Sequence, residues 1–270
     1  MSEHNNQPIK DTHFLERRLR ILIEEVRSSF ERLAKSITEP IEESLRQVQE
    51  VVRTALEELP AKSREALTIL GKHGWYLDTA LSLPELTSLA ELLRREDVKA
   101  AERVLADHYR ARLSQIEHEL AAWCPVRAKI LTPAFDAHRR GEYVLSIPVF
   151  LAQADGVCKA SLDVSLFGRR YNDRLPLTAK AIETRQLDRD SIEAALLHPL
   201  KVPLPISASK QELTGLLNVL NRHEILHGTS VDYGTEVNSL KAISLLYYVA
   251  SVLRKPDDDS SEQNLRCQEP

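Results

Sequence analysis

Apolar residues recur at intervals of three and four through most of this 270-residue chain, and this period constrains the fold more than any other feature. The clearest run follows Asp11 and Thr12, either of which can cap a helix. Its apolar positions are Phe14, Leu15, Leu19, Leu22, Ile23, Val26, Phe30, Leu33 and Ile37. Only 8 glycines and 5% aromatic residues are present, and no alternation of strands with helices is visible. The sequence therefore predicts an all-α protein and argues against a sandwich, a barrel or a Gly-rich nucleotide fold.

The N-terminal region, residues 11–122, is predicted to begin with long amphipathic helices after a disordered lead of residues 1–10. Pro40 interrupts the first run, and a second run over residues 41–59 is expected to stop at Pro60. We expect these two helices to pack on the rest of the chain. An antiparallel pair or a self-associating coiled coil would satisfy the same pattern. This region is a candidate for dimerisation or for sensing a partner.

Further helices are predicted over residues 83–95 and 98–120. Before them, the segment His73-Gly74-Trp75-Tyr76-Leu77 lies between turn residues. We interpret Trp75 as an anchor that docks this half of the chain on the next. The second helix also carries polar ring side chains that we expect on a solvated face, namely His108, Tyr109 and His118.

The C-terminal region, residues 123–254, is predicted to be a four-helix bundle with an irregular surface insertion over residues 160–208. Its helices are expected over residues 126–139, 144–158, 210–227 and 236–253. Asp155 ends a nearly all-apolar run, where a carboxylate is either a hydrogen-bonded structural group or part of a site. Residues 255–270 form an acidic tail that we expect to be disordered.

The insertion is predicted to contain a short helix over residues 191–197. It also carries Arg169, Arg170 and Tyr171 in succession. Such a cluster could contact a phosphate and stack on a nucleic-acid base, or it could be plain loop surface.

One stretch, Leu220-Asn221-Arg222-His223-Glu224-Ile225-Leu226-His227-Gly228, concentrates the chemistry of the chain. Upstream, Ser209-Lys-Gln-Glu212 has the form of a capping box, so we expect a helix to begin there and to run to His227. Gly228 is then the residue that ends it, in the left-handed conformation typical of helix C-termini.

This stretch fits two chemistries, and the first is zinc proteolysis. His223-Glu224-x-x-His227 has the spacing of a zinc-protease helix, with two ligands one turn apart and a glutamate as base. A third ligand is missing, because Ser230 and Tyr233 stand where one protease class would have glycine and histidine. Such helices also continue past the second histidine, whereas Gly228 follows it here. A zinc metalloprotease is therefore kept as an alternative.

The second chemistry is RNA cleavage without a metal, which needs a base for the 2′-hydroxyl, an acid for the leaving 5′-oxygen and a fixed cation. His227 suits the acid, because the helix dipole at a C-terminus favours its charged form. Arg222 offers a planar fork for phosphate oxygens, with His223 as a second polar group. On an ideal helix Arg222 and His227 lie about 140° apart. We therefore expect a site shared by two copies at a two-fold interface.

Spacing alone is weak evidence, because Arg103-x4-His108 fits the same pattern and Arg112 to His118 is one residue longer. Neither pair has a polar residue after the arginine, a helix stop after the histidine or an apolar surround. These features single out Arg222.

Arginine, a polar residue, three more residues and histidine, at the end of the third helix of an all-α bundle, resembles the HEPN (higher eukaryote and prokaryote nucleotide-binding) family. The resemblance covers roughly residues 125–253, about half of the chain, and the four predicted helices would be its core. The insertion is not part of the minimal fold, and the N-terminal half matches no member. The whole chain also resembles uncharacterised bacterial proteins.

This resemblance implies a dimeric, metal-independent endoribonuclease that acts on RNA and needs no cofactor. It also implies a role in phage defence or a toxin–antitoxin pair, with an antitoxin or regulatory protein as partner. Other members are inactive and bind RNA or nucleotides. Residue by residue, the catalytic assignments are Arg222, His227 and His223, with Asp155 as the acidic residue of the second helix and Asn221 and Tyr233 as supporting residues. A structural alternative is that Arg222, His223 and His227 tie a helix end to the turn over residues 232–238.

The net charge of −4 gives no global basic field, so any RNA contact must come from local arginines and lysines. The three cysteines, Cys124, Cys158 and Cys267, are widely spaced and form neither a disulfide framework nor a zinc pattern. The polar N-terminus predicts no signal peptide, and no apolar run reaches membrane-spanning length. We therefore expect a cytoplasmic protein with no metal, no cofactor and no membrane partner.

Overall fold

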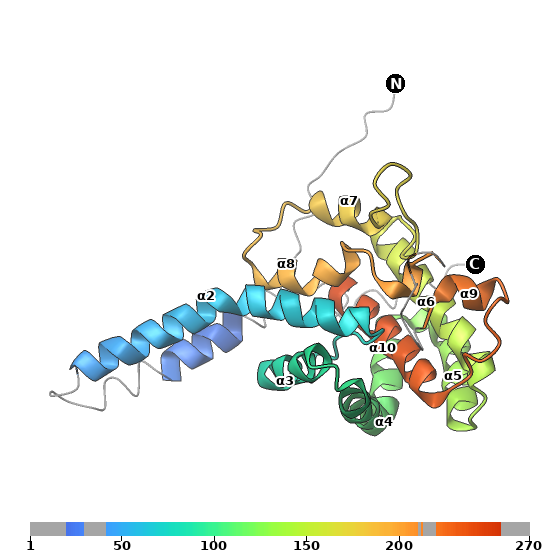
Figure 1. The fold of residues 1–270 in the computed structure, drawn as a ribbon, viewed down its shortest axis with the longest axis horizontal. Helices are drawn as coiled ribbons and strands as arrows, with labels where there is room; N and C mark the ends of the chain where they lie inside the picture. Colours follow the sequence, from blue (N-terminus) through green and yellow to red (C-terminus); the bar gives the residue numbers. More distant parts are fainter. Residues whose placement is uncertain (1–19, 30–41, 210–211, 213–219, 255–270) are drawn as a thin grey trace, which may run out of the picture.

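The computed structural model describes residues 20–29, 42–209, 212 and 220–254 (Figure 1). Within these ranges the regular structure is helical, apart from an isolated bridge between Arg169 and Pro176. The predicted all-α class is confirmed. Among the same residues, no helix combines the length and the apolar character that crossing a bilayer requires.

The longest helix, α2 (Glu42–Lys72), extends to one side of the molecule (Figure 1). It runs through Pro60, so the prediction that this helix stops there is wrong. A proline inside a helix costs about 3 kcal/mol, because it removes one hydrogen bond and crowds the preceding turn. Beyond Pro60, the buried side chains of Ala66, Leu67 and Leu70 pack in the core, with α3 beside them. Their burial outweighs that cost.

The first predicted amphipathic run is helical over residues 20–29. This segment buries its apolar side chains only in part, since Ile21, Leu22 and Val26 are about half exposed. The packing of this helix on the rest of the chain stays a prediction. The remaining parts of the run, and the predicted disordered ends at residues 1–10 and 255–270, lie outside the described residues.

Helices α3 (Leu83–Arg94) and α4 (Val98–Trp123) confirm the two predicted helices that follow. Ser82 and Glu85 form a reciprocal capping box at the start of α3. Trp75 is fully buried and stacks on Tyr109 of α4, with ring centroids 5.7 Å apart. The ammonium of Lys241 in α10 also lies 5.7 Å from the centre of its ring, so Trp75 contacts the C-terminal half as predicted. The prediction of a solvated face is wrong for Tyr109, which is fully buried, and for His108, which is largely buried.

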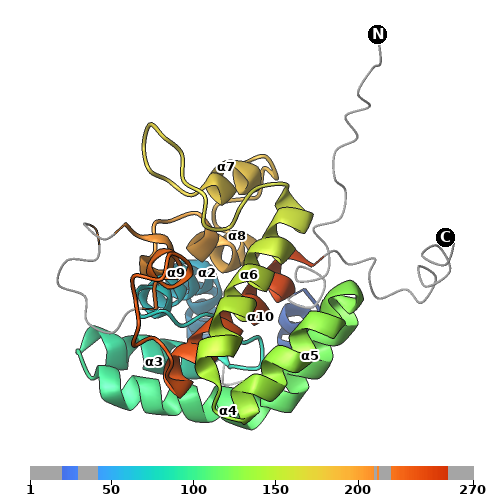
Figure 2. The same ribbon diagram turned by 90° about the vertical axis from the view of Figure 1, so that its right-hand side faces the viewer.

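The C-terminal half is built around α10 (Glu236–Leu253), which runs through the middle of the molecule (Figure 2). Helix α6 (Tyr143–Leu162) packs along it, α5 (Pro125–Arg139) packs on α6, and α4 contacts both α5 and α10. Nearly every side chain of α10 from Ser239 onward is buried. These three C-terminal helices match the predicted elements over residues 126–139, 144–158 and 236–253.

The insertion begins with a loop over residues 163–176, followed by α7 (Leu177–Glu183), α8 (Ile192–Leu196), η1 (His198–Leu200) and η2 (Pro205–Ser207). Helix α8 confirms the predicted short helix. The prediction that the whole insertion lies on the surface is wrong, because several of its residues are buried and α8 and η1 pack on α2. The phenol of Tyr248 in α10 also donates a hydrogen bond to the carbonyl of Leu196 (2.5 Å). The second half of the insertion is therefore part of the core.

The predicted continuous helix over residues 210–227 is wrong. The peptide bonds at Leu220 and Asn221 are not helical, and α9 (Arg222–Leu226) is only five residues long. Residues 210–211 and 213–219 lie outside the described part of the chain. Helix α9 lies beside α6 and η2 on one side of the molecule (Figures 1 and 2).

Candidate functional site

Asn221 breaks the predicted helix because its side chain bonds to three backbone groups. Its amide nitrogen donates to the carbonyls of Pro205 (2.7 Å) and Ala208 (2.8 Å), and its oxygen accepts from the N–H of Glu224 (3.0 Å). This arrangement holds Asn221 in an extended conformation as the N-cap of α9. Of the predicted supporting residues, it is therefore the one that fixes where Arg222 begins the helix.

The other end of α9 is fixed by Gly228, as predicted. Gly228 has a φ of +71° and follows His227, the C-cap residue. The carbonyl of Glu224 accepts hydrogen bonds from the N–H groups of Thr229 (2.9 Å) and Ser230 (3.1 Å). Short as it is, α9 therefore has both ends tied by hydrogen bonds.

Arg222 faces the insertion. Its guanidinium carbon lies 5.3 Å from the centre of the Phe167 ring, which belongs to the 163–176 loop. The Nε atom is buried and has no hydrogen-bond partner among the described residues. A buried guanidinium donor without an acceptor is costly, so the described part of the fold leaves this atom unsatisfied.

His223 and His227 face solvent together. Both side chains are exposed, and their ring centroids lie 4.3 Å apart, as expected for positions one helical turn apart. Within the described ranges neither imidazole makes a hydrogen bond or ion pair. The α9 motif, by which we mean Arg222, His223 and His227, thus carries three polar groups that the fold itself does not use.

Asp155 and Tyr233 hold neighbouring segments of the chain in place. The carboxylate of Asp155 accepts from the hydroxyl of Ser165 (2.9 Å) and from the N–H of Leu166 (2.7 Å). It therefore holds the start of the loop that carries Phe167. The Tyr233 hydroxyl donates to the carbonyl of Val144 (3.1 Å), which ties the connection between α9 and α10 to α6.

The structural alternative for the α9 motif is not seen among the described residues. None of its three side chains bonds to the turn over residues 232–238, which is held instead by Tyr233, Asn238 and the Thr235 cap of α10. Among the described residues, the α9 motif therefore does not connect the end of the helix to this turn.

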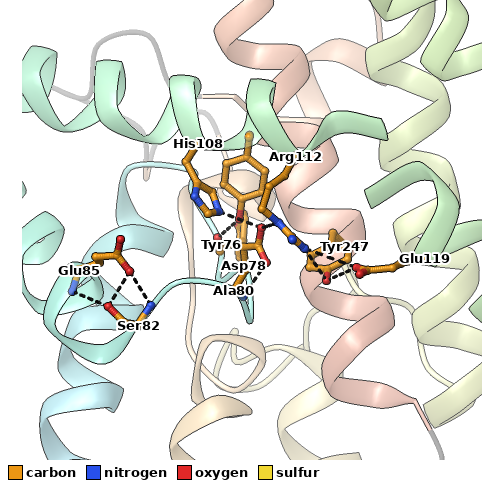
Figure 3. A network of polar contacts seen from close by, with 10 residues as sticks. Tyr76, Asp78, Ala80, Ser82, Glu85, His108, Arg112, Glu119 and Tyr247 are labelled. Carbon is orange, nitrogen blue, oxygen red and sulfur yellow. Dashed lines mark hydrogen bonds and ion pairs between the residues drawn. The ribbon is translucent and has the colours of Figure 1, made fainter. Parts of the chain in front are cut away.

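A second polar cluster, absent from the sequence prediction, lies where the segment after α2 meets α4 and α10 (Figure 3). The fully buried carboxylate of Asp78 lies 2.9 Å from His108 Nε2, and it accepts from Arg112 Nε (2.7 Å) and the N–H of Ala80 (2.9 Å). Arg112 also approaches Glu119 (3.5 Å), which accepts a hydrogen bond from Tyr247 (2.5 Å). We call Asp78, His108, Arg112, Glu119 and Tyr247 the Asp78 cluster.

Electrostatics favour an ionised Asp78. Burial alone would raise the pKa of its carboxyl, but hydrogen bonds from His108 and Ala80 and the charge of Arg112 together lower the pKa. An ionised carboxylate accepts only, so His108 Nε2 is the donor. The cluster connects three elements through one buried carboxylate, and both oxygens of that carboxylate accept hydrogen bonds within the protein. We therefore infer that it stabilises the fold and does not bind a ligand.

A signal for this cluster exists in the sequence. His108 and Arg112 are four residues apart and share one face of α4, and Asp78 directly follows the buried Trp75-Tyr76-Leu77 segment. The pair Arg103-x4-His108 is also explained, because its histidine is committed to Asp78.

Metal ligation was the alternative for His223 and His227. In the described part of the chain, no three residues of the types His, Cys, Asp and Glu are arranged to hold a metal ion. A groove of about 670 Å³ does exist between α2 and α3, lined by residues such as Lys62, Glu65 and Arg94, and it contains no residue of α9.

Comparison with protein-family models, with curated proteins and with solved structures found no match to this chain.

Proposed function

We propose that this chain is a metal-independent endoribonuclease of HEPN type, acting in phage defence or as a toxin, with α9 as its catalytic element. The observation that carries the proposal is the α9 motif. Two adjacent, solvent-facing imidazoles lie beside an arginine whose Nε lacks an acceptor among the described residues. Cleavage of RNA by its own 2′-hydroxyl requires these groups and no others.

In the proposed reaction, the 2′-oxygen attacks the adjacent phosphorus and the bond from phosphorus to the 5′-oxygen breaks. His223 accepts the proton of the 2′-hydroxyl, and a protonated His227 donates one to the leaving 5′-oxygen. Arg222 holds the non-bridging oxygens, where negative charge grows in the transition state. The products are a 2′,3′-cyclic phosphate and a free 5′-hydroxyl, and proton exchange with water restores both histidines.

A homodimer is part of this proposal. Arg222 leans on Phe167 whereas the imidazoles face solvent, so a second copy of α9 would complete a site that one chain leaves open. Exposed apolar side chains near the motif support such a contact. They are Leu226 and Val231 next to His227, and Val144 and Leu145 at the start of α6, to which Tyr233 is bonded.

The same open arrangement supports a second candidate, a non-catalytic RNA-binding module. An arginine and two histidines that do not converge within one chain can still bind a phosphate backbone. The two candidates differ in whether RNA is cut.

The test is cleavage of a 5′-labelled, unstructured RNA by purified protein in excess EDTA. We expect Arg222→Ala and His227→Ala each to slow cleavage about 100-fold or more, the usual effect of losing a general acid or a charge-stabilising donor. Helix content and melting temperature should hardly change, because neither side chain makes a hydrogen bond among the described residues. Arg103→Ala is the matched control, since it alters the other Arg-x4-His pair and should cut at the wild-type rate.

The outcomes separate the candidates. RNA bound without being cut by the wild-type chain favours the binding module. Activity that EDTA abolishes and zinc restores favours the metal-dependent alternative for His223 and His227. A His227→Ala chain that cuts at the normal rate would exclude the proposed acid.

A further inference from the structure

We propose that the 163–176 loop is the substrate-binding lip of this site, and that Tyr171 at its tip stacks on a base of single-stranded RNA. This inference rests on the proposed function and names the class of RNA that the site accepts. It starts from the side chain of Tyr171, which is 97% exposed. A tyrosine left wholly in water makes no contribution to the core, and it offers a flat ring to a ligand.

The loop is held in shape by its own hydrogen bonds. The N–H of Leu177 donates to the carbonyl of Gly168 (2.9 Å), and the N–H of Arg170 donates to the carbonyl of Leu175 (2.8 Å). The side chain of Arg170 pairs with Asp173 across the tip (2.6 Å). A ring presented by an ordered loop loses little entropy on binding, so stacking on it is favourable.

The first half of the loop is tied down at two places. Asp155 holds Ser165 and Leu166 at one end. Arg169, whose side chain is 9% exposed, bonds to Glu212 through one nitrogen (2.8 Å to each carboxylate oxygen). These contacts fix Phe167 under Arg222 and thereby fix the loop relative to the catalytic element.

Chain length limits how far Tyr171 lies from the motif. Tyr171 is four residues from Phe167, so their Cα atoms are at most about 14 Å apart. Both views place the loop and α9 on the same side of the molecule (Figures 1 and 2). A phosphate on Arg222 and a base on Tyr171 can therefore belong to the same short strand.

The chemistry selects unpaired RNA. A base can stack on a protein ring only where it is free of its own neighbours, as in a loop, bulge or single strand, and such stacking tolerates every base. Arg174, next to the tip, is exposed and makes no ion pair within the described ranges, so it is available to a phosphate. The only carboxylate at the tip, Asp173, is neutralised by Arg170.

The test measures binding separately from cleavage, on the full chain carrying His227→Ala so that RNA stays intact. Tyr171→Ala should weaken binding of a fluorescent unstructured RNA about 5- to 150-fold, as expected for the loss of one base–aromatic stack. Tyr171→Phe should keep wild-type affinity, and Asn172→Ala, an exposed neighbour on the same loop, is the matched control. Binding of a blunt RNA duplex should be unaffected by any of these changes.

A direct readout is the fluorescence of Tyr171→Trp, which should be quenched when unstructured RNA is added. Arg174→Ala should lower the dependence of log affinity on log salt by about one unit, as expected for one lost phosphate contact. If the chain binds and cuts RNA but Tyr171→Ala leaves the affinity unchanged and RNA does not quench the fluorescence of Tyr171→Trp, the lip is refuted and the nuclease stands. If the wild-type chain neither binds nor cuts RNA, both proposals fail.

Discussion

The Asp78 cluster and the α9 motif contain similar side chains and use them in opposite ways. In the Asp78 cluster, a buried carboxylate has a partner at each oxygen, and two of these partners come from α4, at least 30 residues further along the chain. In the α9 motif, two imidazoles face solvent and the arginine has a buried donor without an acceptor among the described residues. The first arrangement leaves nothing for a ligand, whereas the second leaves three groups.

This difference separates two pairs that the sequence presents as equals. Arg103-x4-His108 and Arg222-x4-His227 have identical spacing. The imidazole of His108 is hydrogen-bonded to the carboxylate of Asp78, so its Nε2 proton is held by the fold and is not free for a substrate. His227 is the C-cap of a short helix and is exposed. The spacing of two residues shows whether they lie on the same helix. Their hydrogen-bond partners show whether they stabilise the fold or are available to a ligand.

The largest effect should come from Asp78→Asn, which we expect to lower the free energy of unfolding by about 3 kcal/mol. The asparagine oxygen can still accept from Ala80, but its NH₂ group faces the donors of His108 and Arg112. Breaking a buried ion pair by removing one partner costs about 3 to 5 kcal/mol. We place the loss at the lower end, because the Arg112 side chain is 25% exposed and can regain water. The measurement is urea denaturation followed by circular dichroism.

The control is Asp107→Asn, one residue before His108. Its side chain is 64% exposed and pairs with Arg110, so the change should cost under about 0.5 kcal/mol. His227→Ala should be equally mild. If Asp78→Asn were as mild as these two, the Asp78 cluster would not hold the fold and the contrast with α9 would disappear.

The next effect is a pH dependence of the same variant. Since the pKa of Asp78 is lowered in the folded state, its contribution to stability is present above its unfolded value near 3.8. That contribution is lost as the pH falls through the folded pKa. The difference in unfolding free energy between the wild type and Asp78→Asn should therefore be constant from pH 6 to about pH 5 and should shrink as the pH falls from about 4 to 3. A difference that stays constant down to pH 3 would mean that folding does not lower the pKa of Asp78.

The helices were predictable from the sequence where their apolar period and end signals agree. Helix α10 has both, since Thr235 caps it and apolar residues recur along it at intervals of three and four, and α3 has a complete capping box at Ser82. Pro60 misled the prediction because a local rule was outweighed by burial of Ala66, Leu67 and Leu70, which depends on α3. The break before Arg222 was hidden for a similar reason. The atoms that stop the helix at Asn221 are carbonyls of Pro205 and Ala208, in another segment.

In the candidate site, too, the local contacts were predictable from the sequence and the long-range contacts were not. The contact between His223 and His227 and the stop at Gly228 are local, so the sequence predicted them correctly. The position of Arg222 over Phe167 joins residues 55 apart, and the Asp78 cluster joins residues 30 or more apart. The spacing of apolar residues along the sequence carries no information about contacts between residues so far apart. Whether Arg222, His223 and His227 cut RNA stays a prediction.

A smaller loss of stability than that of Asp78→Asn should come from Gly228→Ala, which also tests the α9 motif directly. A Cβ at Gly228 meets no atom within 4 Å, so the cost is only that of an alanine with a φ of +71°, about 1 kcal/mol. Gly141 is a matched control, because it has a φ of +76° after α5 and is equally open. Both variants should therefore lose about the same stability in urea denaturation.

Only Gly228→Ala should also slow RNA cleavage, because it disturbs the turn that fixes His227 beside His223, whereas Gly141 lies at the end of α5. Gly228→Asn should recover part of the activity, since asparagine tolerates the left-handed conformation better than alanine does. Equal losses of cleavage in Gly228→Ala and Gly141→Ala would mean that the rate follows overall stability. The α9 motif would then contribute no more to RNA cleavage than any other exposed helix end.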